Sequence, residues 1–348
     1  MSHLTYAEAG FVGLLQGITE LFPISSLGHA VLIPALVGGQ WAQDLNVSKA
    51  ESPYLAYIVG LHVATAAAMI IYFWRDWLRI IKAFFASLKH FALPEPGTAR
   101  WELQGTDQKL AWMIILATIP VGLAGLKLEH LFRTTFSKPI LTAIFLFGNG
   151  LILLAGERAR RRGADMEAQE MAADLQAVTE RQKAAVAAGS HGGGGRHSSG
   201  QRALRQQHAS LAVESDRRIV RRTGWLGSVA IGASQILALL PGISRDGTAM
   251  VTGMFRGLSR QDAARFSFLL SAPVILAAGV LKVPDLTGPL GAGIRGQVLF
   301  GSLLSGIGAY LALRFLMRYF SDPRRTLTPF AIYSLAVGLG AAIYLSVR

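Results

Sequence analysis

Two short stretches of the sequence place charged residues in the middle of apolar runs. One reads QGITELFPISSLGH (16–29) and carries Glu20; the other reads LPGISRDGT (240–248) and carries Arg245. A guanidinium group offers a planar fork of donors that suits phosphate, and a carboxylate can hold a cation. An arginine in apolar surroundings costs at least ~2.5 kcal/mol to insert, so Arg245 needs an anionic partner: Glu20, Asp246 or a substrate. These residues indicate a site for a phosphate-like group.

The remainder of the chain is typical of a polytopic membrane protein. Its 348 residues are 51% hydrophobic and 16% charged, whereas soluble domains carry about 25% charged residues. The absence of cysteine excludes disulfides and thiolate metal sites. Nearly charge-free stretches of roughly 17–25 residues are long enough to cross a bilayer as helices, and they lie at 54–74, 110–126, 139–155, 263–281, 297–313 and 327–346.

The net charge of +13 is concentrated between these stretches. An excess of Lys and Arg marks the cytoplasmic side of a membrane protein. The positions of these charges therefore predict the topology, and we expect no nucleic-acid partner. All the basic segments can be cytoplasmic together only if an even number of crossings separates each pair. The six spans allow this if 11–37 and 225–255 each enter and leave the membrane by the same face. The basic segments are 75–109, 156–222, 256–265 and 317–325.

Proline explains how 11–37 can turn back inside the membrane. Pro23 lacks an amide hydrogen and should end a helix that reaches Phe22. Broken backbone at membrane depth is tolerated only where protein or a wet cavity surrounds it. We therefore expect 8–37 to form a re-entrant hairpin of two half-helices, with Ser25 as the N-cap of the second.

The second half of the chain repeats this layout. Pro241 and Gly242 should break a half-helix, and Ser244 or Asp246 could cap the next one. Each half then has one re-entrant hairpin followed by three transmembrane helices. Because three is odd, the second copy is inverted, and its broken helices should face those of the first at the midplane. The predicted fold class is an all-α polytopic membrane protein with an inverted repeat.

This layout divides the chain into three parts. Residues 1–156 form an N-terminal membrane repeat, and 223–348 form a C-terminal one. Residues 157–222 form a polar, basic and partly disordered cytoplasmic insert, with a short polar helix expected at 201–218. Its small and polar residues cannot bury a core of their own.

Both charged stretches resemble the two signature motifs of the undecaprenyl-diphosphatase family, the bacitracin-resistance membrane phosphatases. The first signature is Glu or Gln, three residues, Glu, and then Ser-Ser-x-Gly-His; the second is Pro-Gly-x-Ser-Arg-Ser-Gly-x-Thr. The resemblance extends to LHVATAAAMIIYFWRDW (61–77) and ATIPVGLAGLKLEHLF (117–132). It covers nearly the whole chain except about 157–222.

The resemblance implies hydrolysis of undecaprenyl diphosphate to undecaprenyl phosphate and inorganic phosphate at the outer face of the bacterial cytoplasmic membrane. This reaction recycles the lipid carrier of cell-wall synthesis and protects against bacitracin. The resemblance also implies a divalent cation, Mg²⁺ or Ca²⁺, as cofactor. The expected partners are the lipid substrate and membrane lipids, and a homodimer is left open.

The resemblance also implies roles for individual residues. Gln16 and Glu20 lie four apart on one helical face and would hold the cation. Ser26 is the candidate nucleophile, and His29 would move its proton or protonate the leaving group. Arg245 would stabilise charge on the phosphoryl oxygens. Two rival mechanisms are attack by His29 itself, or activation of a water by Glu20.

Five further residues are predicted to contact the substrate: Ser25, Gly242, Ser244, Asp246 and Thr248. Asp246 departs from the family pattern, which usually has Ser at this position. It could neutralise Arg245, cap the half-helix or add a metal ligand. For His62, in the first predicted span, a structural role is the better interpretation.

A different class of function uses the same features. Inverted repeats with broken helices are also a transporter architecture, so the anion site could instead carry a lipid phosphate across the bilayer. A transporter needs only the anion site and alternating access, whereas the phosphatase needs Ser26 and His29 near Arg245.

Overall fold

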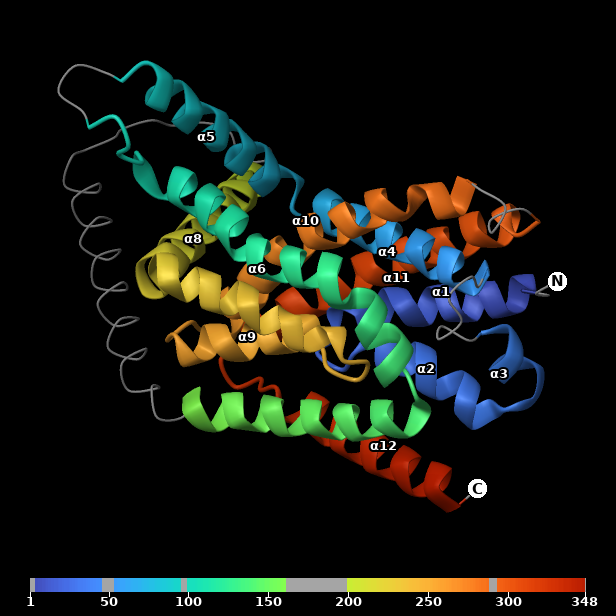
Figure 1. Cartoon of the computed structure of the whole chain (residues 1–348). Helices are drawn as coiled ribbons and strands as arrows, with labels where there is room; N and C mark the ends of the chain where they lie inside the picture. The colour runs from blue at the N-terminus through green and yellow to red at the C-terminus, as the bar shows by residue number, and fades with distance from the viewer. Residues whose placement is uncertain (1–3, 46–52, 95–98, 161–198, 288–292, 348) are drawn as a thin grey trace.

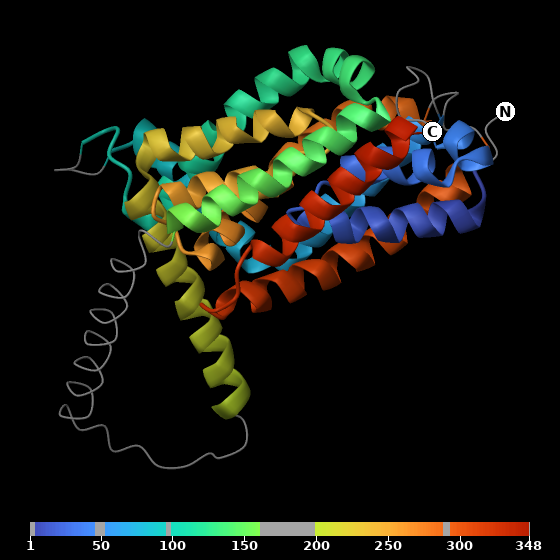
Figure 2. The same ribbon diagram turned by 90° about the horizontal axis from the view of Figure 1, so that it is seen from below.

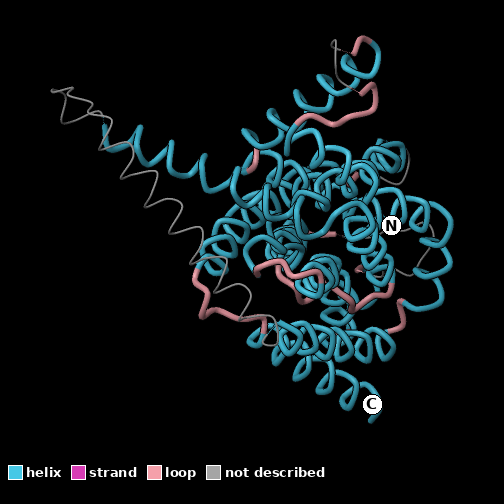
Figure 3. Tube along the Cα trace, turned by 90° about the vertical axis from the view of Figure 1, so that its left-hand side faces the viewer, coloured by secondary structure: helices cyan, strands magenta, loops and turns pink. Residues whose placement is uncertain are grey.

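The protein is an all-helical bundle in the part of the chain that the structure describes. This structure is a computed structural model, and it describes residues 4–45, 53–94, 99–160, 199–287 and 293–347. Figure 3 shows only helices and loops in these ranges. The helices are α1 (Tyr6–Leu21), α2 (Ser26–Val37), α3 (Gly39–Asp44), α4 (Pro53–Tyr72), α5 (Trp74–Ala92), α6 (Gly105–Phe136), an unlabelled helix Pro139–Arg160, α8 (Ser199–Ser234), the 3₁₀ helix η1 (Gln235–Leu239), α9 (Arg245–Phe255), α10 (Arg260–Thr287), α11 (Arg295–Ser321) and α12 (Thr328–Val347).

The helices that are long and apolar enough to span a membrane lie where the sequence predicts them. Five helical segments are long and apolar enough to cross a bilayer: Gly105–Leu128, Pro139–Arg160, Arg260–Val280, Arg295–Ser321 and Thr328–Val347. The predicted stretch 54–74 becomes α4, which qualifies as a sixth span when it is taken with α5, at a bend of 84°. The helices run mainly along one direction in Figure 1. The predicted all-α membrane fold is confirmed at this level.

Both predicted helix breaks are present. α1 ends at Leu21 and α2 begins at Ser26, so Pro23 lies between them as expected. Ser25 is the N-cap of α2, since its hydroxyl accepts a hydrogen bond from the Gly28 amide at 3.2 Å. Four residues, Phe22 to Ser25, thus separate two helices that would otherwise form one apolar run, because Pro23 cannot continue the first helix.

The second break separates η1 from α9. Pro241 and Gly242 lie in the gap, and Ser244 is the N-cap of α9, because its hydroxyl accepts from the Gly247 amide at 3.0 Å. Of the two capping residues left open by the sequence, Ser244 is therefore the one used.

Glycines set how closely the helices approach. α1 packs on α11, and a Cβ at Gly13 or Gly17 would run into the α11 backbone at Gly301 or Ser305. α8 packs on α6 in the same way, since a Cβ at Gly232 would meet the α6 backbone at Ala117. Small residues allow such backbone contact between membrane helices.

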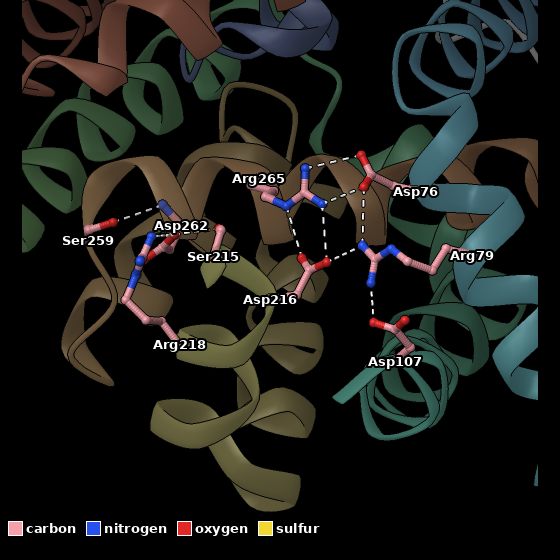
Figure 4. Close-up of polar contacts among 9 residues, drawn as sticks. All are labelled: Asp76, Arg79, Asp107, Ser215, Asp216, Arg218, Ser259, Asp262 and Arg265. Atoms are coloured by element: carbon pink, nitrogen blue, oxygen red, sulfur yellow. Dashed lines mark hydrogen bonds and ion pairs between the residues drawn. The ribbon is translucent and has the colours of Figure 1, made fainter. Parts of the chain in front are cut away.

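The end of the predicted insert belongs to the folded core. α8 projects from the bundle in its first turns (Figure 2), but Asp216 and Ile219 are fully buried. Arg265 of α10 donates to Asp216 at 3.0 Å and to Asp76 of α5 at 2.9 Å. Arg79 of α5 also donates to Asp216, so this cluster joins three helices (Figure 4).

The start of the predicted insert is folded too. Glu157, within the helix Pro139–Arg160, is buried and paired with Arg260 at the start of α10. The boundaries drawn at 157 and 222 therefore do not coincide with the limits of the folded part. The predicted polar helix at 201–218 lies within the longer α8, whereas 161–198 lie outside the described residues.

Candidate active site

A cavity of about 190 Å³ lies between the two helix breaks. It brings together residues from both charged stretches, although more than 200 residues of chain separate Glu20 from Arg245. An α4 residue and an η1 residue complete its polar lining. The polar residues that line it are Glu20, Ser25, Ser26, His62, Gln235, Ser244 and Arg245.

The Glu20 carboxylate is the centre of the polar contacts in this cavity. One oxygen, Oε2, accepts from the Gln16 amide at 2.8 Å and from the Ser26 hydroxyl. The other oxygen, Oε1, accepts from Nη2 of Arg245. Glu20 is therefore the anionic partner of Arg245 among those that the sequence left open. A buried carboxylate of this kind is tolerated because a charged donor compensates for its lost hydration.

Ser26 and Arg245 are the first residues of α2 and α9, so both helices begin at the cavity. Each helix N-terminus contributes about half a positive charge and free amide hydrogens. Together with the Arg245 guanidinium, they make the cavity electropositive around Glu20, as an anion site requires.

Ser25 joins the two breaks to each other. Its hydroxyl accepts from the Gly242 amide at 3.2 Å, in addition to its capping contact in α2. Ser25 has a φ of 68°, and Gly242 a φ of 112°. Holding a non-glycine residue such as Ser25 in this region costs about 1–3 kcal/mol, and the packing of the two loops must compensate for this cost. Ser25 lines the cavity, whereas Gly242 uses its amide to hold the loop.

Asn149 also joins the breaks, although it lies outside both charged stretches. Its side-chain amide donates to the Pro23 carbonyl at 2.9 Å, and its oxygen accepts from the Ser244 amide at 2.9 Å. Asn149 is fully buried. A polar residue in the otherwise apolar stretch 139–155 is the signal that could have found it, because such groups in membrane helices need partners.

Asp246 faces away from the cavity. Its Oδ1 accepts from the hydroxyls of Ser267 at 2.7 Å and Ser271 at 2.5 Å, both on α10. It neither pairs with Arg245 nor caps α9, so its position does not support the predicted contact with substrate. Thr248 is also absent from the cavity lining, and its hydroxyl donates to the Arg245 carbonyl at 2.9 Å.

His29 is not brought to Ser26 and Glu20. Its Nδ1 lies 2.7 Å from the Ser25 carbonyl, and its Nε2 lies 2.8 Å from the hydroxyl of Tyr333 on α12. The two rings stack at a centroid distance of 5.7 Å. His29 is not among the residues that line the cavity, so the predicted proton transfer by His29 is not supported by this geometry.

His62 occupies the place that His29 was expected to take. Its Nε2 lies 3.2 Å from the Gln16 amide nitrogen and 3.5 Å from Oε2 of Glu20. Its Nδ1 lies 2.8 Å from the Ile58 carbonyl, which fixes the proton of a neutral ring on Nδ1. The Nε2 lone pair then faces the Gln16 amide. The sequence signal for this role was a histidine inside a predicted membrane span, because ionisable residues at such positions usually mark a functional site.

The cavity offers ligands for a cation that is shared with phosphate. Glu20 supplies a carboxylate. Gln16, the other predicted ligand, does not line the cavity, and its amide nitrogen donates to Glu20. Gln235 is buried, and neither end of its amide has a hydrogen-bond partner among the described residues. No group of three His, Asp or Glu residues in the described ranges could enclose a metal. This set fits Mg²⁺, which often uses one or two carboxylates together with waters and phosphate oxygens.

The comparisons with known proteins agree with the family resemblance of the two charged stretches. The model of a family described as "Bacitracin resistance protein BacA" matches residues 9–190 and 201–340. The match includes most of 157–222, so the resemblance is wider than the sequence motifs indicated.

Curated relatives match along the full chain. The undecaprenyl-diphosphatase of Mycolicibacterium paratuberculosis is 54% identical, with 100% of this chain and 99% of the relative covered. Undecaprenyl-diphosphatase 2 of Frankia alni is 50% identical, with 97% of each chain covered. The undecaprenyl-diphosphatase of Granulibacter bethesdensis is 34% identical, with 97% and 96% covered. The predicted family is confirmed, and the chain belongs to the bacitracin resistance protein BacA family.

Proposed function

We propose that this protein hydrolyses undecaprenyl diphosphate to undecaprenyl phosphate and inorganic phosphate, which recycles the lipid carrier of cell-wall synthesis and confers bacitracin resistance. Family membership and the names of the relatives support this activity. One observation carries it at the level of residues: the Glu20 carboxylate accepts from both the Ser26 hydroxyl and the Arg245 guanidinium in one buried cavity.

This contact supports a serine mechanism. Ser26 Oγ attacks the terminal phosphorus while Glu20 accepts its proton. The bond from phosphorus to the bridging oxygen breaks, and undecaprenyl phosphate leaves. Water then hydrolyses the phosphoserine and releases inorganic phosphate. Arg245 and the amides at the start of α9 stabilise the charge on the phosphoryl oxygens.

Two rival mechanisms remain in competition with this one. Glu20 could activate a water without a covalent intermediate, since it is buried in the same cavity. Attack by His29 has less support, because its Nε2 is hydrogen-bonded to Tyr333. His62 is the alternative proton carrier, since its Nε2 faces Gln16 and Glu20.

A divalent cation would be held by Glu20 and Gln235 together with the oxygens of the substrate, while Gln16 orients the Glu20 carboxylate through its amide. When bound, such an ion neutralises negative charge on the diphosphate. Gln235 is included because it is buried beside the cavity with an unpaired amide.

The size of the cavity supports recognition of the head of the substrate alone. Its volume of about 190 Å³ is below the ~300–1,000 Å³ that encloses most drug-sized ligands. The diphosphate would occupy this space, and the prenyl chain would remain in the bilayer or against the apolar surface of the helices.

The contacts between helices support the inverted repeat. α4 and α10, each the first long helix after a break, pack against each other. α1 packs on α11, while its counterpart α8 packs on α6, the counterpart of α11. We infer from this exchange that α1–α2 and the segment from the end of α8 to α9 are the two re-entrant hairpins.

The distribution of basic loops supports insertion in a membrane with one end of the bundle on the cytoplasmic side. That this is the cytoplasmic membrane, and that the site opens to its outer face, is proposed from the family resemblance. The end of α5, the start of α6, the end of the helix Pro139–Arg160 and the first part of α8 lie at one end of the bundle, on the left in Figure 1. Both chain termini lie at the other end. An excess of Lys and Arg at one end identifies it as cytoplasmic.

Phosphate release from a C15 or C55 prenyl diphosphate by the purified protein tests the proposal. We expect release that EDTA suppresses and that Arg245→Ala abolishes, while Arg324→Ala, at an exposed side chain, behaves as wild type. Detergent solution separates hydrolysis from transport, because transport needs sealed compartments. The comparisons do not support the transporter alternative, and absence of release from folded protein would refute the phosphatase.

A further inference from the structure

A second cavity, separate from the candidate active site, lies between the start of α6 and the middle of α8. Its volume is about 580 Å³. It shares no lining residue with the active-site cavity. Its lining includes Lys109, Met113, Glu214, Arg217, Arg221 and Trp225.

The lining carries an excess of positive charge. Lys109 and three arginines, Arg217, Arg218 and Arg221, face a single acid, Glu214. Arg218 is bound to Asp262 of α10 at 2.8 Å. Arg217 contacts Glu214 at 3.4 Å, and both of these side chains are largely exposed to solvent. An exposed pair of this kind is weak, so an anion in the cavity can compete for Arg217.

The α8 wall of this cavity is held in place from its other side. Asp216 pairs with arginines of α5 and α10, and Arg218 is held by Asp262 of α10 (Figure 4). Ser215 also donates to Asp262 at 2.5 Å. Arg217 and Arg221, on the same helical segment, line the cavity together with Arg218. The basic residues therefore stand on a preorganised wall, which lowers the cost of ordering them around a ligand.

The cavity lies where the polar and apolar surfaces of the protein meet. The apolar span of α6 starts at Gly105, one turn before Lys109. On α8, Trp225 is 43% exposed and the next residue, Leu226, is 85% exposed. Met113 and Trp225 provide an apolar side to the lining. Tryptophan is enriched at the membrane–water interface, so this position suits a ligand with a charged head and an apolar tail.

We propose that this cavity binds the phosphate group of an anionic phospholipid, with Lys109, Arg217 and Arg221 as its charged ligands. Basic pockets between membrane helices on the cytoplasmic side bind such headgroups. The acyl chains would lie against the exposed apolar residues that follow Trp225. The site is independent of the proposed hydrolysis.

The test measures binding of phosphatidylglycerol to the full-length protein in an uncharged detergent by native mass spectrometry. The variant is Lys109→Ala/Arg217→Ala. The matched control is Arg324→Ala/Arg325→Ala, which removes the same charge from exposed arginines elsewhere. At about fivefold for each basic side chain near anionic lipid, the first pair should weaken binding roughly 25-fold, and the control pair less than about twofold.

Several results would overturn the proposal. Equal weakening in both pairs would indicate diffuse charge attraction, and no weakening in either would exclude the cavity. Equal binding of phosphatidylcholine would show that the cavity does not require an anionic lipid. If inorganic phosphate alone stabilised the protein against heat as well as the lipid does, the ligand would be a free anion. Should the alanine pair fail to fold, Lys109→Gln/Arg217→Gln gives the same comparison.

Discussion

Glu157 and Arg260 form a buried ion pair whose contribution to stability can be measured. Nε and Nη2 of Arg260 donate to the two Glu157 oxygens at 2.7 and 2.6 Å. The side chains are 9% and 4% exposed for Arg260 and Glu157. Glu157 also accepts from the Leu327 amide at 2.7 Å, so it ties the helix Pro139–Arg160 to α10 and to the start of α12.

Removing the carboxylate should be costly, because it leaves a guanidinium buried without its counter-charge. For such a change the expected loss is about 3–5 kcal/mol of unfolding free energy. Glu157→Ala should fall in this range. Asp322→Ala is the control: Asp322 pairs with Arg324, whose side chain is 89% exposed, and pairs at the surface contribute at most about 1 kcal/mol.

The assay is reversible unfolding of purified protein in mixed detergent and SDS micelles, followed by the helical circular dichroism signal. A double variant, Glu157→Met/Arg260→Met, separates charge from packing. It should recover most of the loss, since neither charge remains buried. The reasoning is refuted if Glu157→Ala is as stable as Asp322→Ala, or if the double variant is no more stable than the single one.

Four site variants test the remaining assignments, three through phosphate release by purified, folded protein and one through its unfolding free energy. Ser26→Ala should reduce release by more than about 100-fold, and retention of most activity would remove the serine mechanism. His62→Ala should reduce phosphate release by about 100-fold, because the side chain that carries the proton is lost, whereas activity within twofold of wild type would exclude that role. Asp246→Ser should keep release within about tenfold, or roughly 1.4 kcal/mol of barrier, and complete loss would show that Asp246 takes part in the chemistry. Asn149→Ala should lower the unfolding free energy by about 1–3 kcal/mol, because the Ser244 amide and the Pro23 carbonyl lose their buried partner; an unchanged free energy in the SDS titration would contradict this.

The elements of this fold are determined largely by local sequence. Each predicted span falls on a helix because bilayer-spanning length and lack of charge are properties of a continuous stretch. Both breaks fall at Pro23 and Pro241 because a missing amide hydrogen acts on the preceding turn. Ser25 as a cap follows from the same local rules.

The limits of the insert could not be predicted in this way. Glu157 and Asp216 lie in polar, charged sequence, which is typical of a solvent-exposed segment. Their burial depends on arginines of other helices, Arg260 and Arg265, that reach them only after the bundle packs. Composition contains no information about such a partner.

The candidate site shows the same division. The sequence alone identified Glu20 and Arg245 as charges that must have a partner, because an isolated charge in apolar surroundings is costly. Only the tertiary structure decided that they pair with each other, that His62 rather than His29 faces Glu20, and that Asp246 turns to the serines of α10. The reason is physical: residue types and spacing set which groups need partners, whereas the direction of each side chain is set by helices that are distant in sequence and adjacent in space.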